Sequence, residues 1–237
     1  MGGCYVMMLL LAFLFSCMVT FEDSDDRLAL TLEQGETSKA FSSKTPLKSS
    51  AKIVIFSKDN ILGHGSSNYF KSGKYKFILT AAHVLDHPYS SFILDGEELV
   101  KLKVLYLNRA NDIAIAIPEK QLINISPKTL RVNKDRDLIG ETIYYAGFPQ
   151  DLDKALFKGF VAQSGTNAIV VQSFALPGSS GSVMFDFWGR AIGVVSAVKV
   201  GVSGVNPFPE LVESIVIVQR VGFLNHKFLK ELFEKDE

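Results

Sequence analysis

A serine in a short loop of small residues is the first place in this sequence where chemistry could occur. Ser180 stands in the stretch Leu176–Ser182 (LPGSSGS), with a glycine directly after it and another two residues before it. Such a loop can hold a hydroxyl clear of the neighbouring strands while backbone amides point toward one spot. A serine hydroxyl is a weak nucleophile at neutral pH, so it needs a histidine base and a carboxylate to orient that base. Without such partners the loop is a polar β-turn.

A histidine at the end of an apolar segment is the candidate base. His83 follows the run 77–82, which passes from large apolar to small residues, as expected of a strand that ends beside a cleft. The other histidines have less constrained surroundings: His64 is in a glycine-rich turn, His87 is beside a proline, and His226 is in a segment with helical periodicity. We therefore expect His83 to act as the base.

An aspartate directly before a fully apolar segment is the candidate orienting residue. Asp112 precedes 113–117 (IAIAI), where its carboxylate is poorly placed for solvation. It either starts the strand as a turn residue or is buried against a partner. We favour the second role, because His83 and Ser180 are present to use it. Asp112 would then accept the Nδ1 proton of His83, fix the tautomer of the ring and stabilise the imidazolium.

The elements that must position these residues are short strands. After Ala51 the sequence consists of β-branched and aromatic runs, separated by turn residues at intervals of about ten residues. Helical periodicity is almost absent before Val221, which favours an antiparallel barrel or sandwich. From Val221 to Glu234 apolar residues recur at helical intervals, which predicts a C-terminal amphipathic helix. The fold is therefore expected to be all-β, with strands at 52–56, 75–79, 99–107, 113–117, 142–146, 168–172, 182–185, 191–198 and 214–218.

The first 50 residues are expected to lie outside this domain. Residues 4–21 carry no charge and match a bilayer span or a signal-peptide core in length, and an acidic cluster follows them. We therefore expect a hydrophobic segment at 1–21, either a signal peptide or a membrane anchor; a buried core helix is the alternative. The catalytic domain would then be membrane-anchored or secreted, outside the cytoplasm. Residues 22–50, rich in polar and charged side chains, are expected to be a linker.

The composition argues against several classes of function. The chain of 237 residues has 25 basic and 25 acidic side chains, and this balance gives no sign of nucleic-acid binding. Its cysteines, Cys4 and Cys17, both lie in the hydrophobic segment. The rest of the chain has no thiol for a disulfide or a zinc–thiolate site, and we expect neither a metal nor another cofactor.

Together, the motifs TAAH at 80–83, DIAI at 112–115 and GSSGS at 178–182 resemble those of the chymotrypsin-like serine peptidases. In their residue pattern they are most similar to the disulfide-free bacterial branch of high-temperature-requirement and glutamyl-endopeptidase type. The resemblance implies a serine endopeptidase that acts on proteins or peptides. It also implies two antiparallel six-stranded β-barrels in a domain at 51–237, with the barrels at roughly 51–130 and 131–220 and the terminal helix at 221–234.

The resemblance also gives roles to residues around the nucleophile. The backbone N–H groups of Gly178 and Ser180 would bind the oxyanion of the transition state. Ser179 stands where zymogen-activated relatives carry an aspartate, so no trypsinogen-like activation switch is expected. Ser182 replaces a glycine of many relatives, and this change between small residues should preserve activity.

By resemblance, the segments at about 174–177 and 196–201 would form the wall of the primary specificity pocket. Ser196 would pair with the substrate backbone. These segments contain no acidic residue, so cleavage after Arg or Lys is not expected and a small or apolar residue fits better. Lys199 leaves open a preference for an acidic residue. The candidate substrate-binding residues are Phe174, Ala175, Leu176, Ser196, Ala197 and Val198.

Two other functions stay open at this point. One is a membrane-tethered binding module that keeps the fold without catalysis. The presence of His83, Asp112, Ser180 and Gly178 argues against it, because binding alone does not need all four. The other is a viral or phage peptidase that processes a polyprotein by the same chemistry.

Overall fold

The computed structural model describes residues 45–58, 60–150, 152–202 and 209–236. The hydrophobic segment expected at 1–21, and the expected linker up to residue 44, lie outside the described residues. Within the described residues, no helix has the length and apolar character needed to cross a membrane.

The first half of the domain is a closed antiparallel barrel. Its strands run in the order β1-β4-β5-β6-β3-β2, and pairing between β1 and β2 closes the ring. The short strand β7 (Lys128–Thr129) is added in parallel to β2. The barrel strands are β1 (Ser50–Ser57), β2 (Asn60–Ser72), β3 (Tyr75–Thr80), β4 (Ser90–Asp95), β5 (Glu98–Asn108) and β6 (Ile113–Pro118).

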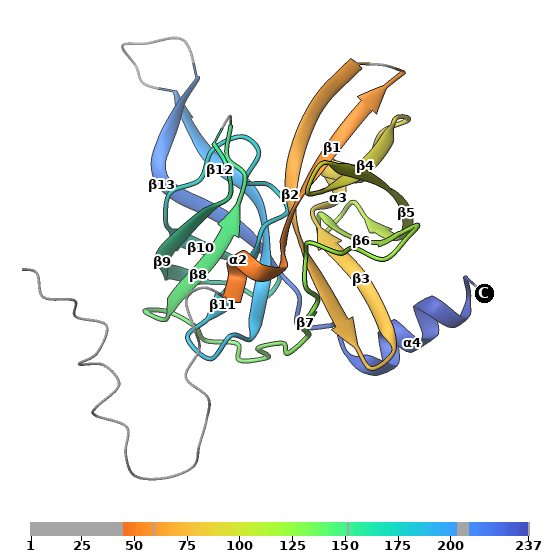
Figure 1. Cartoon of the computed structure of the whole chain (residues 1–237). Helices are drawn as coiled ribbons and strands as arrows, with labels where there is room; N and C mark the ends of the chain where they lie inside the picture. The colour runs from red at the N-terminus through yellow and green to blue at the C-terminus, as the bar shows by residue number, and fades with distance from the viewer. Residues whose placement is uncertain (1–44, 59, 151, 203–208, 237) are drawn as a thin grey trace, which may run out of the picture. The chain divides into compact units, whose positions relative to one another are not determined.

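The second half is a closed barrel with the order β10-β13-β12-β11-β8-β9. Figure 1 shows it beside the first barrel. The expected fold, two six-stranded antiparallel barrels followed by a helix, is thereby confirmed. The strands are β8 (Thr142–Gly147), β9 (Ala155–Ser164), β10 (Ala168–Gln172), β11 (Val183–Asp186), β12 (Ala191–Val202) and β13 (Pro209–Arg220).

Each barrel surrounds an apolar core. The core of the first barrel also includes, from the second barrel, Val183, Phe185, Ala191 and Val194. The core of the second barrel includes Tyr145 and Ile169, both fully buried. The core of the first barrel contains the apolar start of β6 and extends to Val221, Leu224 and Leu229, which follow the second barrel in the chain. The C-terminal segment therefore returns to pack on the first barrel and ties the two halves together.

Three short helices complete the described part of the chain. The terminal helix α4 (His226–Glu234) begins later than the periodicity indicated, because the side chain of Asn225 caps it by accepting a hydrogen bond from Phe228 N. At the other end, α2 (Thr45–Ser49) occupies the last part of the segment expected to be a linker and contacts β8. The single turn α3 (Ala82–Leu85) follows β3.

Candidate active site

His83 and Asp112 meet where two paired strands come together. The strands next to them in the chain belong to one ladder, in which Thr80 of β3 pairs with Ala114 of β6. His83 lies on α3 directly after β3, and Asp112 directly precedes β6. His83 Nδ1 lies 2.8 Å from Asp112 Oδ2, and the backbone N–H of His83 donates to Asp112 Oδ1 at 2.9 Å. The carboxylate therefore fixes both the ring of His83 and the start of α3.

The backbone of Asp112 takes the conformation that aims its carboxylate at the histidine. Its φ is +45°, in the left-handed region, which aspartate tolerates better than most residues. Ser196 Oγ donates a third hydrogen bond to this carboxylate, at 2.5 Å from Oδ2. The expectation that Ser196 pairs with the substrate backbone is untested. The β12–β13 pairing skips this residue at a register shift.

The electrostatic environment keeps Asp112 ionised. Partial burial alone would raise the pKa of its carboxyl group, since the side chain is only 18% exposed. The hydrogen bonds from the His83 ring, from Ser196 and from His83 N outweigh burial and hold the pKa of Asp112 below its usual value. The carboxylate can therefore stabilise a positive charge on His83.

The loop around Ser180 leaves two backbone donors unused. Gly178 has a φ of +93° and Gly181 a φ of +90°, so glycine is favoured at both positions. The N–H of Gly181 donates to Val195 O, and the N–H of Ser179 to Leu176 O. Among the described residues, the N–H groups of Gly178 and Ser180 donate no hydrogen bond. These are the two amides that the resemblance assigns to the oxyanion.

The side chains of Ser180 and His83 are not hydrogen-bonded to each other in the part of the chain that the structure describes. Half of the His83 side chain is exposed, and Ser180 is partly buried. Hydrogen bonds between catalytic groups are often long or absent until substrate is bound. The geometry therefore provides an oriented histidine and an accessible serine.

Ser66 joins the nucleophile loop to the first barrel, a role that the motifs in the sequence did not predict. Its hydroxyl donates to Gly178 O at 2.6 Å and accepts from Phe148 N at 2.9 Å. Its backbone N–H donates to Ser180 O at 2.8 Å, and its carbonyl accepts from Thr80 Oγ1 at 2.8 Å. The only sequence signal is the run of small residues at 65–67 inside a strand, which indicates a close approach of another backbone segment.

His64 lies beside the nucleophile loop. It belongs to β2 rather than to the turn expected from the sequence, and its Nε2 lies 3.0 Å from Phe148 O. A Cβ atom at Gly178 would be 2.4 Å from Phe148 O and 2.5 Å from His64 Nε2. His64 and Phe148 therefore form a close wall around the glycine that carries one of the free amides.

The remaining histidines have local partners away from Asp112. His87 Nε2 lies 3.0 Å from Val84 O, and His226 Nδ1 lies 3.1 Å from Ser72 Oγ. Among the described residues, no cluster of three or more His, Cys, Asp or Glu side chains could hold a metal ion.

The candidate substrate-binding residues are largely apolar and partly exposed. The ring of Phe174 is stacked on Phe157 at 5.8 Å, and Phe157 is stacked on Tyr145 at 4.9 Å. The buried hydroxyl of Tyr145 donates to Phe174 O, and burial raises the pKa of Tyr145. Phe174 remains 51% exposed. Ala175 and Leu176 are half-buried and Ala197 is exposed, whereas the side chain of Val198 is outside the described residues.

Comparison with known proteins identifies the family. A family model for the trypsin-like peptidase domain matches residues 65–194, more than half of the chain, and this range includes His83, Asp112 and Ser180. The chain belongs to the trypsin-like peptidase family. The peptidase is accordingly of the serine type and an endopeptidase. Its assignment to the disulfide-free bacterial branch stays a prediction.

The fold of this peptidase is similar to that of the serine endoprotease from Yersinia pestis. The two have a TM-score of 0.62 and 16% sequence identity, and the match covers 83% of this chain and 68% of the other. At this identity the likeness concerns the fold alone. No curated protein matches the sequence.

Replacing Gly178 by alanine should lower activity, because Phe148 and His64 leave no space for a methyl group at this position. The added Cβ would clash with Phe148 O and His64 Nε2, so the loop must shift and move the Gly178 N–H. Loss of one oxyanion donor lowers turnover by about 100- to 1000-fold, and we expect Gly178→Ala to lose that much kcat on a peptide substrate.

Gly140→Ala is the matched control for Gly178→Ala. Gly140 also has a positive φ, of +83°, but nothing lies within 4 Å of the position that its Cβ atom would take. This variant should therefore share the backbone strain and keep its turnover. Equal activity of the two folded variants would contradict the assigned role of Gly178.

The pKa of Asp112 leads to a prediction about stability. Because its pKa is lower in the folded than in the unfolded chain, the carboxylate stabilises the fold above the unfolded value of about 4, and this contribution is lost as the pH falls through the lower folded pKa. Asp112→Asn should therefore unfold more easily than the wild type at neutral pH, and the difference should shrink below about pH 4.

Urea unfolding curves between acidic and neutral pH measure this difference. Asp153→Asn is the control, because this aspartate is exposed and makes no hydrogen bond or ion pair among the described residues. It should follow the wild-type curve. If Asp112→Asn destabilises the fold equally at every pH, the negative charge of Asp112 does not stabilise the folded protein, and the prediction is wrong.

Proposed function

We propose that this endopeptidase cleaves peptide bonds with Ser180 as nucleophile, His83 as general base and Asp112 as the residue that orients the base. The observation that carries the proposal is the 2.8 Å contact between His83 Nδ1 and Asp112 Oδ2. The unused amides of Gly178 and Ser180 support it, because they provide donors for the negative charge that develops on the substrate carbonyl oxygen.

The reaction divides into two steps. In the first, Ser180 Oγ attacks the carbonyl carbon of the scissile bond while His83 Nε2 takes the hydroxyl proton. The tetrahedral intermediate places its oxyanion against the Gly178 and Ser180 amides. His83 then gives its proton to the leaving amine, the C–N bond breaks, and the acyl group remains on Ser180.

In the second step water takes the place of the leaving amine. His83 accepts a proton from the water as it attacks the ester, and returns the proton to Ser180 Oγ when the ester bond breaks. Asp112 retains its charge throughout. Hydrogen bonds from Ser196 and from His83 N prevent its carboxylate from rotating away from the ring.

Hydrolysis of peptides by the Ser180→Ala variant tests this mechanism. Removing the nucleophile should lower turnover about a million-fold, because the remaining triad residues have no group to activate. The measurement is the rate of cleavage of a mixed peptide library, followed by mass spectrometry, for wild type and variant at equal folded concentration.

Ser182→Ala is the matched control in the same loop. The Ser182 hydroxyl is buried and has no hydrogen-bond partner among the described residues, so its removal should leave turnover unchanged. Two results would contradict the mechanism: full activity of Ser180→Ala, or a folded wild-type protein that cleaves no peptide. The second result would favour the binding module.

The specificity that we propose is for a small or medium apolar residue before the scissile bond. The apolar character and partial exposure of Phe174, Leu176 and Ala197 support it. The peptide library should show cleavage sites enriched in such residues, because an apolar wall offers no charge to pair with Arg or Lys. Enrichment of Glu or Asp that disappears in Lys199→Gln would replace this proposal with the acidic preference.

We also propose that the domain acts outside the cytoplasm, secreted or held at a membrane by the uncharged segment 4–21. The length of that segment supports the proposal. Expression of the full chain in bacteria should place the peptidase in the membrane or exported fraction, and deletion of residues 2–21 should leave it in the cytosol. Cytosolic recovery of the full chain would contradict this.

A further inference from the structure

A cavity of about 590 Å³ lies on a part of the domain that the peptidase mechanism does not use. Its walls come from β5 and the turn before β6, from the connection between the barrels at 133–136, from the β9–β10 turn at 164–167 and from the chain around the end of β13. Its volume is in the range of small-molecule sites. One lining residue, Asn111, directly precedes Asp112.

Arg220 is a fixed positive charge in the wall of this cavity. Its guanidinium donates to the carbonyls of Gly165, Asp135 and Arg136 and to Ser164 Oγ, at 2.6 to 2.9 Å. These acceptors are uncharged, and no carboxylate among the described residues pairs with the guanidinium. Burial lowers the pKa of Arg220, as expected for a cation that has lost part of its water without gaining an anionic partner.

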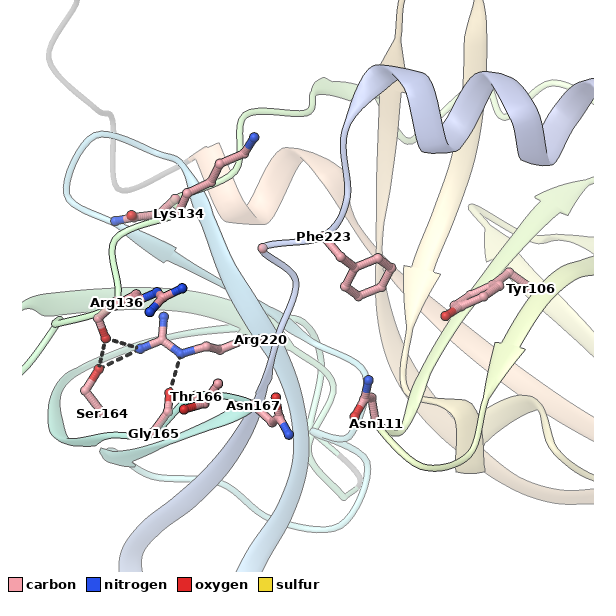
Figure 2. Close-up of a pocket in the computed structure, with 12 residues that line it drawn as sticks. Tyr106, Asn111, Lys134, Arg136, Ser164, Gly165, Thr166, Asn167, Arg220 and Phe223 are labelled. Carbon is pink, nitrogen blue, oxygen red and sulfur yellow. Dashed lines mark hydrogen bonds between the residues drawn. The ribbon is translucent and has the colours of Figure 1, made fainter.

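Two more cations line the same cavity. The side chains of Lys134 and Arg136 make no hydrogen bond or ion pair within the described residues. The neighbouring acids do not line it: Asp135 lies 3.4 Å from the Arg190 guanidinium, and the Asp137 carboxylate accepts from a backbone amide. Figure 2 shows Lys134 and Arg136 on the side of the cavity where Arg220 lies. The cavity therefore has three cations and no carboxylate in its lining.

The other wall is aromatic. Tyr106 and Phe223 lie across from the cations in Figure 2, with their ring centroids 6.2 Å apart. In the β9–β10 turn, Thr166 and Asn167 offer side-chain donors that no described residue uses. Such a site can bind a doubly charged oxyanion at one end and a flat apolar group at the other.

We propose that this cavity binds a small ligand that carries a phosphate group on a flat apolar ring. Arg136 and Lys134 bind the phosphate oxygens, with Arg220 as the fixed charge behind them. The ring lies against Phe223. A phosphate dianion matches the excess of positive charge better than a single carboxylate, and the planar guanidinium of Arg136 can bind two of its oxygens.

Isothermal titration of the full-length protein with phenyl phosphate, at constant ionic strength, tests this proposal. We expect saturable binding to one site, and binding at least ten-fold weaker in Arg136→Gln. This variant removes the free guanidinium but keeps the Arg136 carbonyl, which accepts hydrogen bonds from Arg220 and Ser164. An unchanged melting temperature without ligand will show that the fold is intact.

Lys76→Gln is the matched control, since it removes an exposed lysine that does not line the cavity. It should bind phenyl phosphate as the wild type does. Absence of saturable binding to the wild type, or equal weakening in Lys76→Gln and Arg136→Gln, would overturn the proposal. Inorganic phosphate that binds as tightly as phenyl phosphate would overturn the role of the aromatic wall.

Discussion

The four hydrogen bonds of Ser66 are the constraint on which the geometry around Ser180 depends. Three of them connect a strand of the first barrel to the nucleophile loop and to the chain after β8, which belong to the second barrel, and the fourth, from Thr80, holds Ser66 within the first barrel. The fit leaves no space for a larger group: a Cβ atom at Gly181 would lie 2.0 Å from Ser66 O. A serine on one barrel and glycines on the other are therefore needed together, and the free amides of the loop result from this packing.

The second constraint is electrostatic, and it acts through a single carboxylate. Asp112 receives three hydrogen bonds, two from His83 and one from Ser196 of the second barrel. The base is thus held by residues of both barrels, as is the nucleophile loop. The C-terminal segment strengthens this arrangement, because Val221 and Leu229 pack into the core of the first barrel after the chain has completed the second. Catalytic geometry and fold stability therefore depend on the same interface.

Strand patterns in the sequence predict an all-β barrel or sandwich, because they are properties of neighbouring residues, whereas the two six-stranded barrels come from the family resemblance of the motifs. Those local motifs also single out His83 and Asp112 as partners. Local residue patterns did not predict β2, β4, β7 or β9 as strands. In β9 the large apolar residues Leu156 and Phe160 face solvent, so the alternation of apolar and polar residues is lost. The contacts of Ser66 and the cationic cavity join segments far apart in the chain. The small residues at 65–67 indicate a close approach of another segment, but a single sequence does not say which segment that is. The helix expected from Val221 begins at His226 because a polar cap, rather than apolar periodicity, sets its start.

Reaction of the full-length protein with a fluorophosphonate probe tests whether Ser180 is an activated nucleophile, because the probe reacts with a serine only when a base and an oxyanion site activate it. We predict that the folded wild-type protein is labelled at Ser180, as located by peptide mass spectrometry, that Asp112→Asn is labelled far more slowly, and that Ser180→Ala is not labelled. A folded wild-type protein that is not labelled, or label on a different serine, would contradict it.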